Sequence, residues 1–492
     1  MESENTCEQS FQDDPENDGT GGLAEEASTE VGQEVSATEQ ESSGAEQALQ
    51  EAGEAGSAEN AKADADSVDS KEKSADNDLS KEKTDDSKVT KTVAQHYNEL
   101  RESGLEARGN SRIFYLRNFN NWIKSVLIGD TLQKVQKERS CDHKYVVLDM
   151  CSGKGGDMLK WKKGRISKLV CVDIASTSVE QSEARFKDIV ERNQNSKRRE
   201  QIFDAEFITA DVSKQRLKDM YKDPSISFDL VSCQFALHYS FESYSQADMM
   251  MKNVAECLQP GGYFIGTTPN SYELVNRLRK SETNSFGNDV YKVEFLSEDK
   301  DNLPLFGSQY SFQLEGVVDC PEFLVYFPAL VKLAEKYDMK LVEKQSFSDY
   351  FKRHHKTSEN RTLLGRMQAL EPYPAENYGK LISSNEKDYA FAKEALDKDL
   401  PNQQQSNRRP VKVGTLSEPE WKAISLYMVF VFQKVGDQKD EPKAEVEESA
   451  EQEEEEPHGV KRSLSEPEEE EDDDDENKAS DAKIIHTVDD DE

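Results

Sequence analysis

Between residues 145 and 268, short apolar runs alternate with longer amphipathic stretches, and this alternation limits the possible folds more than any other feature of the chain. The apolar runs are rich in valine, leucine, isoleucine and phenylalanine, as expected for strands that are buried on both faces. Strands and helices that alternate in this way form a parallel sheet covered by helices on both sides. We therefore predict an α/β fold with strands at 145–150, 168–174, 205–210, 228–234 and 262–268 and helices at 157–163, 177–193 and 244–258.

The segments on either side of this core follow other patterns. Two helices, at 93–108 and 111–128, are predicted to open the fold. After Pro269 the apolar runs become short, which indicates inserted antiparallel strands, then a helix and a closing antiparallel pair at the sheet edge. The polar segment 352–415 is predicted to hold one helix, 362–370, and a flexible loop. The inserted strands are expected at 291–295, 310–312 and 316–319, the helix at 327–337, and the closing pair at 339–346 and 425–435.

The two ends of the chain are strongly acidic and poor in apolar residues. Residues 1–90 and residues 437–492 each hold 26 acidic and 6 basic residues, whereas residues 91–436 hold 47 acidic and 50 basic residues. Segments with the composition of the ends bury too little apolar surface to offset the entropy lost on folding. We therefore predict disordered acidic tails at 1–90 and 437–492 around one folded domain at 91–436. A solubilising role is expected for the tails, with an autoinhibitory or partner-binding role as the alternative.

The composition also disfavours several classes of protein. The chain has no apolar run near the ~18 residues of a membrane span, and it opens on acidic and polar residues rather than a secretory signal. Its seven cysteines are scattered without a Cys-x-x-Cys pair, so we expect free thiols in a reducing compartment. We accordingly expect no metal site and no membrane partner.

The sharpest local motif is a strand that runs into a glycine-rich turn, from Val146 to Gly156. Glycines let the backbone approach a ligand, and the N-terminus of the following helix adds a positive end. The next strand ends in Asp173, where a carboxylate can bind ribose hydroxyls, and the third ends at Asp211, which can accept from an adenine amino group. An ordinary turn is the alternative for the glycines, and a helix N-cap for Asp211. Because these features share the carboxyl edge of the sheet, we predict a nucleotide-type ligand there.

Motifs on both sides of this edge resemble a known family. The Leu-Asp pair before the turn resembles S-adenosylmethionine-dependent methyltransferases rather than dehydrogenases with a Gly-x-Gly-x-x-Gly turn. Segments 115–124, 154–161, 233–239, 321–327 and 426–430 resemble the mRNA cap guanine-N7 methyltransferases of animals. The resemblance covers about residues 92–436. It implies a Rossmann-like class I S-adenosylmethionine-dependent methyltransferase fold with inserted antiparallel strands, flanked by disordered acidic tails.

The resemblance implies that S-adenosylmethionine is the methyl donor and assigns residues to it. Lys124 is similar to the family's lysine that meets the methionine carboxylate, although a surface lysine is the alternative. Cys151 stands where the family usually has glycine, and a backbone contact to the cofactor there requires this residue to avoid positive φ. Gln234 and Tyr239 would flank the sulfonium and methyl region. The implied cofactor-binding residues are Lys124, Cys151, Asp173, Asp211, Gln234 and Tyr239.

The resemblance also implies a site for the cap guanine. A carboxylate at Glu322 can accept from N1–H and the 2-amino group of guanine, an edge that is readable only in single-stranded or terminal nucleotides. Aromatic rings such as Tyr427 can stack on the base, and cations can meet the triphosphate. Without the resemblance, Glu322 would equally suit a helix N-terminus and Tyr427 a core strand. The implied cap- and RNA-binding residues are Asn120, Asn121, Lys154, Lys160, Arg185, His238, Glu322 and Tyr427.

The implied reaction is methyl transfer to N7 of the guanosine cap at the 5′ end of mRNA. Guanine N7 has a lone pair and no proton, so we predict no catalytic acid or base and expect positioning to supply the rate. The implied partners are 5′-capped mRNA and a small activating subunit, which the 352–415 region could dock, and the implied location is the nucleus. Two alternatives stay open: a methyltransferase for another RNA or a small molecule, and a non-catalytic acidic-tailed binding scaffold, which the altered glycine at Cys151 would favour.

Overall fold

The computed structural model describes residues 86–99, 109–140, 142–375, 380–403, 412–436 and 485–487. Most of the two predicted tails, and the second half of the predicted helix 93–108, lie outside these residues. Helix α1 (Asp86–Glu99) begins inside the segment assigned to the N-terminal tail. A short strand, β14 (Ile485–Thr487), lies inside the segment assigned to the C-terminal tail.

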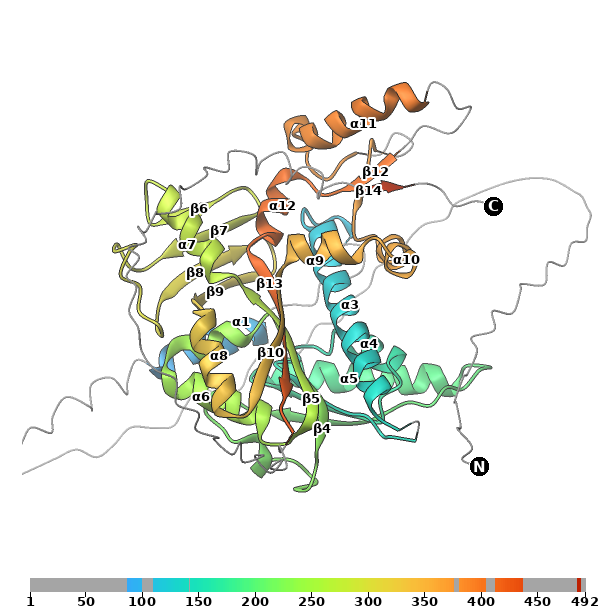
Figure 1. Cartoon of the computed structure of the whole chain (residues 1–492), viewed down its shortest axis with the longest axis vertical. Helices are drawn as coiled ribbons and strands as arrows, with labels where there is room; N and C mark the ends of the chain where they lie inside the picture. The colour runs from blue at the N-terminus through green and yellow to red at the C-terminus, as the bar shows by residue number, and fades with distance from the viewer. Residues whose placement is uncertain are drawn as a thin grey trace, which may run out of the picture. The chain divides into compact units, whose positions relative to one another are not determined.

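A seven-stranded sheet forms the centre of the fold (Figure 1). Its strands are β1 (Val146–Met150), β2 (Lys168–Asp173), β3 (Asp204–Thr209), β4 (Phe228–Gln234), β5 (Leu258–Pro269), β10 (Met339–Ser346) and β13 (Tyr427–Lys434). They lie in the order β10-β13-β5-β4-β1-β2-β3. The five strands from β5 to β3 are parallel, whereas β13 runs antiparallel to both of its neighbours. The predicted parallel sheet and the closing antiparallel pair are therefore both confirmed.

Side chains along each strand alternate between two apolar cores, one on each face of the sheet. Val147 and Leu169 belong to one core, and their neighbours Leu148 and Val170 belong to the other. This alternation explains why the strands appear in the sequence as continuous apolar runs. The first core also takes side chains from α3 (Phe114–Glu138), α4 (Met158–Lys163) and α9 (Phe347–His354). The second takes side chains from α6 (Tyr244–Ala255) and α8 (Phe327–Lys336), while α5 (Ser176–Gln194) covers β2 and β3.

A smaller antiparallel sheet is inserted between β5 and α8. Its strands are β6 (Ser285–Gly287), β7 (Tyr291–Phe295), β8 (Gln309–Leu314) and β9 (Val318–Phe323), in that order. β7 and β8 confirm two of the predicted inserted strands, whereas β9 lies later than the predicted strand 316–319, because Gly316 (φ 65°) is in the turn before it. Strand β6 and the preceding helix α7 (Ser271–Lys280) were not predicted. Helix α1 packs against both β9 and α5, so it bridges the inserted sheet and the parallel core.

The segment 352–415 is more structured than predicted. Helix α10 (Ser358–Arg366) lies earlier than the predicted helix 362–370, because the Thr357 side chain caps its start by accepting from the Asn360 backbone N–H. A small antiparallel sheet of β11 (Glu371–Tyr373), β12 (Lys412–Thr415) and β14, together with α11 (Ala390–Gln403), occupies the rest of what is described there. The predicted flexible loop is therefore wrong for these residues. A final helix, α12 (Glu418–Ile424), leads into β13.

Candidate active site

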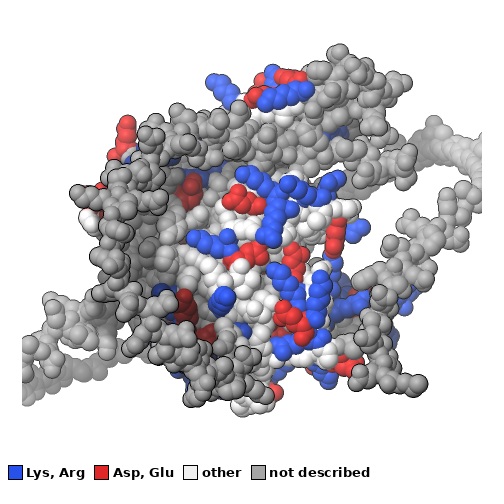
Figure 2. All heavy atoms as spheres, viewed as in Figure 1, with Lys and Arg blue, Asp and Glu red and all other residues white. Residues whose placement is uncertain are grey.

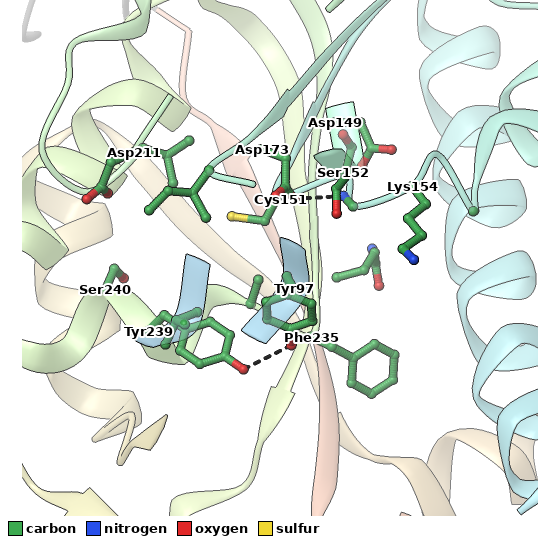
Figure 3. Close-up of a pocket in the computed structure, with 18 of the residues that line it drawn as sticks. Tyr97, Asp149, Cys151, Ser152, Lys154, Asp173, Asp211, Phe235, Tyr239 and Ser240 are labelled. Atoms are coloured by element: carbon green, nitrogen blue, oxygen red, sulfur yellow. Dashed lines mark hydrogen bonds between the residues drawn. The ribbon is translucent and has the colours of Figure 1, made fainter. Parts of the chain in front are cut away.

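A cavity of about 460 Å³ opens at the carboxyl edge of the parallel strands (Figure 3). Its walls come from the loops after β1, β2, β3 and β4, from α3 and α5, and from α1. This volume lies within the range of about 300–1,000 Å³ that is usual for small-ligand sites. In Figure 3, Asp211 lies at one end of the cavity, Asp149 and Lys154 lie at the other, and Cys151 and Asp173 lie between them.

The loop after β1 takes a path that its glycines allow. Gly153 and Gly155 have φ values of 52° and 71°, a region that side chains disfavour. A Cβ atom on Gly155 would also lie 2.6 Å from Met158 Cε and 2.7 Å from Ser182 Oγ, so a larger residue would force these side chains to shift. The turn brings the Gly153 N–H within 2.8 Å of Asp173 Oδ2, to which it donates. The loop is thereby tied to the end of β2.

Cys151 adopts the same left-handed conformation as the glycines that follow it, with φ of 54°. Avoiding positive φ was the condition set from the sequence for a backbone contact between Cys151 and the cofactor, and Cys151 does not meet it. The loop keeps a path suited to glycine, and Cys151 bears a backbone cost of about 1–2 kcal/mol. A hydrogen bond with Cys233, together with burial, raises the pKa of the Cys151 thiol. A thiol held protonated in this way packs the cavity wall and is a poor nucleophile.

Two carboxylates at successive strand ends line the cavity. Asp173 Oδ1 accepts from the Ala175 N–H at 2.9 Å. Burial raises the pKa of Asp173, and its backbone donors oppose the rise. Asp211 Oδ1 accepts from the Ser213 N–H at 3.0 Å and from the Ser213 hydroxyl at 2.6 Å. Asp211 thus caps a turn rather than the helix that the sequence offered as an alternative, and it lines the cavity as well.

Lys124 reaches the cavity from α3 and is held there by Asp157. The Lys124 Nζ atom lies 2.9 Å from Asp157 Oδ2, and Lys160 Nζ lies 2.7 Å from Asp157 Oδ1. Burial alone would raise the pKa of Asp157, but the two ammonium groups outweigh it and lower that pKa. Burial, reinforced by the negative charge of Asp157, raises the pKa of the neighbouring Asp149. Lys124 is therefore a fixed cation in the cavity wall rather than a freely moving surface lysine.

The wall on the β4 side carries an amide and two hydroxyl groups in fixed positions. The Gln234 side-chain amide donates to the Ser232 hydroxyl at 3.1 Å and accepts from the Thr267 hydroxyl at 3.2 Å. The Tyr239 hydroxyl lies 3.1 Å from the Tyr97 hydroxyl (Figure 3). Burial raises the pKa of both tyrosines, so both stay protonated at neutral pH. Tyr97 comes from α1 and was not predicted, since nothing in the sequence near it indicates a ligand.

A second cluster of buried side chains adjoins the cavity at Tyr239. Glu322 Oε2 accepts from the Tyr310 hydroxyl at 2.9 Å, and Glu322 Oε1 lies 3.2 Å from His238 Nε2. The His238 and Tyr239 rings are in contact, with centroids 4.3 Å apart. A buried carboxylate thus accepts from a phenol and lies beside an imidazole whose neighbour in the chain, Tyr239, lines the cavity.

Tyr427 closes this cluster on the side of the main sheet. Its ring centroid lies 5.1 Å from that of Phe235, which lines the cavity, and 6.4 Å from that of Phe312 on β8. Burial, reinforced by the charge of Glu322, raises the pKa of Tyr427. Tyr310 and Phe235 were not predicted, and they join His238, Glu322 and Tyr427 to the cavity.

The predicted site residues therefore fall into three groups. Those in the cavity wall are Lys124, Cys151, Lys154, Asp173, Arg185, Asp211, Gln234 and Tyr239. Those in the adjoining cluster are His238, Glu322 and Tyr427. The remaining three are Asn120, Asn121 and Lys160, which are outside the wall. Lys160 Nζ donates to Asn121 Oδ1 at 2.5 Å, and Asn120 Oδ1 is buried without a hydrogen-bond partner in the described part of the chain.

The surface near the cavity is rich in cations. Figure 2 shows lysine and arginine side chains gathered over α4, α9 and α10, whose last turns are all basic. Such a surface suits a polyanion. Within the described ranges, no three or more His, Cys, Asp or Glu side chains are grouped to hold a metal ion. None of the helices that the structure describes is both long and apolar enough to cross a membrane.

The fold and the cavity together define a class of protein. The chain has the features of class I S-adenosylmethionine-dependent methyltransferases. These are a parallel sheet in the order β5-β4-β1-β2-β3, a glycine-rich loop after β1, acids after β2 and β3, and an antiparallel β13 beside β5. Within that class, residues 80–435 match the mRNA (guanine-N(7))-methyltransferase domain. The chain belongs to this family.

The chain is similar to two animal proteins and, in fold, to a solved bacterial methyltransferase. The mRNA cap guanine-N(7) methyltransferase of Drosophila melanogaster is 49% identical over 349 residues, which is 70% of this chain and 77% of that protein. The protein of the same name from Caenorhabditis elegans is 42% identical over 349 residues, 70% of this chain and 86% of that one. Among solved structures, the CcbJ methyltransferase of Streptomyces caelestis is 11% identical with a TM-score of 0.35, covering 64% of this chain and 96% of that one.

Proposed function

We propose that this chain transfers a methyl group from S-adenosylmethionine to N7 of the guanosine cap at the 5′ end of mRNA. The contact between the two sites carries the proposal. Tyr239 lines the cavity and packs against His238, which in turn lies 3.2 Å from Glu322. A donor in the cavity and a base held by Glu322 would therefore meet beside Tyr239. Family membership and the names of the relatives support the same substrate.

The groups in the cavity wall suit S-adenosylmethionine, which supplies an electrophilic methyl group when it is bound. Asp173 suits a pair of ribose hydroxyls, and Asp211 suits the adenine amino group. Lys124, fixed by Asp157, suits the methionine carboxylate. Gln234 and Tyr239 would flank the sulfonium and the methyl group. The backbone of Cys151 would approach the cofactor only at the cost of its left-handed conformation, the same path that its glycine neighbours take without strain.

The adjoining cluster suits an unmethylated guanine. The Glu322 carboxylate can accept from N1–H and the 2-amino group, while Tyr310 donates to it and His238 lies beside it. The rings of Tyr239 and Tyr427 offer faces for stacking, worth about 1–3 kcal/mol per base in comparable sites. The remaining cations and amides would meet the triphosphate and the adjacent nucleotides. These residues are Asn120, Asn121, Lys154, Lys160 and Arg185.

The mechanism that follows is one of alignment. Guanine N7 has no proton to remove, so none of the side chains acts as a general base. The two clusters hold the base and the donor in a fixed relation, and such alignment supplies roughly 7–11 kcal/mol of the barrier in favourable systems. Tyr97 and Tyr239 stay protonated and provide a hydroxyl pair at the junction. We assign no catalytic acid or base.

The proposal includes three points that rest on the family resemblance and the composition. The site of action is the nucleus, where new transcripts are capped. A small activating subunit docks on the 352–415 region. The catalytic domain extends over residues 91–436 between acidic tails at 1–90 and 437–492.

The test is methyl transfer from labelled S-adenosylmethionine to three RNAs: one with an unmethylated GpppG cap, one uncapped and one already methylated at N7. We expect transfer to the unmethylated cap alone. Glu322→Ala should lower this activity about 100-fold or more, because two charge-assisted hydrogen bonds of about 1.5–3 kcal/mol each are lost. The cofactor product should still bind to the variant, since Glu322 lies outside the cavity wall. Glu315→Ala, an exposed acid on the β8–β9 turn, is the matched control.

Two results would contradict the proposal. Transfer to the uncapped RNA would indicate another acceptor. A pH–rate profile with an ionisation near neutrality that one substitution abolishes would indicate a general base.

A further inference from the structure

Two tyrosines on α7 and α8 form an exposed aromatic pair that the proposed reaction does not use. Tyr272 is 51% exposed and Tyr326 is 41% exposed. Their ring centroids lie 6.5 Å apart, with an angle of 47° between the ring planes. Tyr326 is the residue that caps α8, and Tyr272 is the second residue of α7, so both rings start from fixed helix ends. The pair therefore presents preformed π faces to solvent.

A lysine completes this group. Lys344, on the edge strand β10, holds its Nζ atom 5.0 Å from the Tyr272 ring centroid and 4.5 Å from that of Phe327. A cation at this distance from an aromatic face is attracted by the ring. The two exposed tyrosine rings and the Lys344 ammonium group combine the features that bind single-stranded nucleic acid. In such sites the bases stack on aromatic rings and the phosphate lies near a positive charge.

The aromatic pair is tied to the proposed cap site at two points. Strand β13 pairs with β5 so that Tyr427 is opposite Pro269, and the Asn270 N–H donates to the Leu426 carbonyl at 2.7 Å. Tyr272 follows two residues after Asn270. Tyr326 lies just past the end of β9, the strand that carries Glu322. The backbone segments that hold both sides of the guanine site thus lead directly into the two exposed rings.

We propose that Tyr272, Tyr326 and Lys344 form a platform for the first nucleotides after the cap, with bases stacked on the tyrosines and a backbone phosphate near the lysine. This inference rests on the proposed function, because it needs a capped RNA whose chain continues beyond the guanine site. Stacking is tolerant of sequence, since every base has a π face. The platform would therefore favour capped RNA over the free cap without selecting a sequence.

The experiment compares two substrates for each variant: the GpppG dinucleotide and a GpppG-capped RNA of about ten nucleotides, a length within the usual site sizes for single strands. For Tyr272→Ala and Tyr326→Ala, we expect KM for the longer RNA to rise at least about fivefold, as expected for the loss of one stacked base. The KM for GpppG and both kcat values should stay unchanged. Tyr272→Phe and Tyr326→Phe should restore the low KM, because they keep the ring.

The matched control is Tyr244→Ala. Tyr244 is 53% exposed and lies 5.8 Å from Lys336 Nζ, but it belongs to α6, away from these helix ends. It should affect neither substrate. Equal KM changes for GpppG and the longer RNA would overturn the inference. No change in KM for either substrate would also overturn it, because a protein partner rather than RNA would then fit the aromatic pair.

The proposed function and the platform fail in different ways. If the unaltered protein methylates neither substrate, the proposed function fails. The platform is then judged by fluorescence anisotropy of the same RNA, in which the two alanine variants must bind more weakly than the Tyr244→Ala control. Unchanged RNA binding would overturn it.

Discussion

The backbone strain at Cys151 should lower the stability of the fold, and a pair of substitutions can separate this effect from the loss of the thiol. Cys151 has φ of 54°, and the left-handed conformation costs a residue with a Cβ atom about 1–2 kcal/mol. Glycine avoids this cost but loses more backbone entropy on folding, by about 0.4–1 kcal/mol. The difference leaves Cys151→Gly more stable than Cys151→Ala by roughly 0.5–1 kcal/mol.

The comparison of these two variants removes the other effects of the substitution. Both delete the thiol, and with it the hydrogen bond to Cys233 and the packing against the apolar core on the α6 side. They differ only in the Cβ atom, so the difference between them reports the backbone conformation. The free energy of unfolding would be measured in urea, and the melting temperatures should differ by about 1–2 °C per kcal/mol for a folded domain of this size. An alanine variant as stable as the glycine variant, or more stable, would refute the strain argument.

Two further predictions follow from buried carboxylates. Asp157→Asn removes the charge that holds Lys124 and Lys160, whose Nζ atoms lie 2.9 and 2.7 Å from the carboxylate. We expect the free energy of unfolding, measured in urea, to fall by about 3 kcal/mol, and calorimetry to show weaker binding of the cofactor product. Unchanged values for both would contradict the role of this ion pair. Burial raises the pKa of Glu420 from 4.5 to about 7, so its contribution to stability is complete below pH 4.5 and is lost as the pH rises through 7. Relative to Glu420→Gln, the native protein should therefore lose about 2 kcal/mol of unfolding free energy between pH 5.5 and 8, and a difference that is constant with pH would count against it.

The parallel core was predictable because its signals are local. The strand predicted at 228–234 is β4, residue for residue, since a run of apolar residues buried on both faces has clear limits. The helix starts were harder. Asn270 caps α7 by accepting from the Tyr272 N–H, and Thr357 caps α10 in the same way. Both capping residues are visible in the sequence as possible helix starts. The polar residues after Pro269 and in 352–415 suit loops as well as helices, and tertiary packing decides which of the two forms.

The two halves of the site differ in how far the sequence alone could lead. Glycines and acids at the ends of β1, β2 and β3 converge because neighbouring parallel strands bring their carboxyl ends to one edge, so a residue pattern was enough to place them. The tyrosine at position 97 carries no such pattern, and it reaches the cavity only because α1 crosses from β9 to α5. Its role depends on packing between elements that are remote in the chain.

The cluster of His238, Tyr310, Glu322 and Tyr427 depends entirely on such packing. Glu322 meets Tyr310 because the two residues are opposite each other in the β8–β9 pair, and it meets His238 because β9 packs on the helical turn after β4. Tyr427 joins them because β13 enters the sheet antiparallel to β5, in a register that sets it opposite Pro269. A shift of that register by one residue would turn the Tyr427 ring to the other face of the sheet, into the core that holds Met428. The cluster around Glu322 therefore forms only once the last strand is in place, whereas most of the cavity wall comes from the chain up to the helical turn after β4.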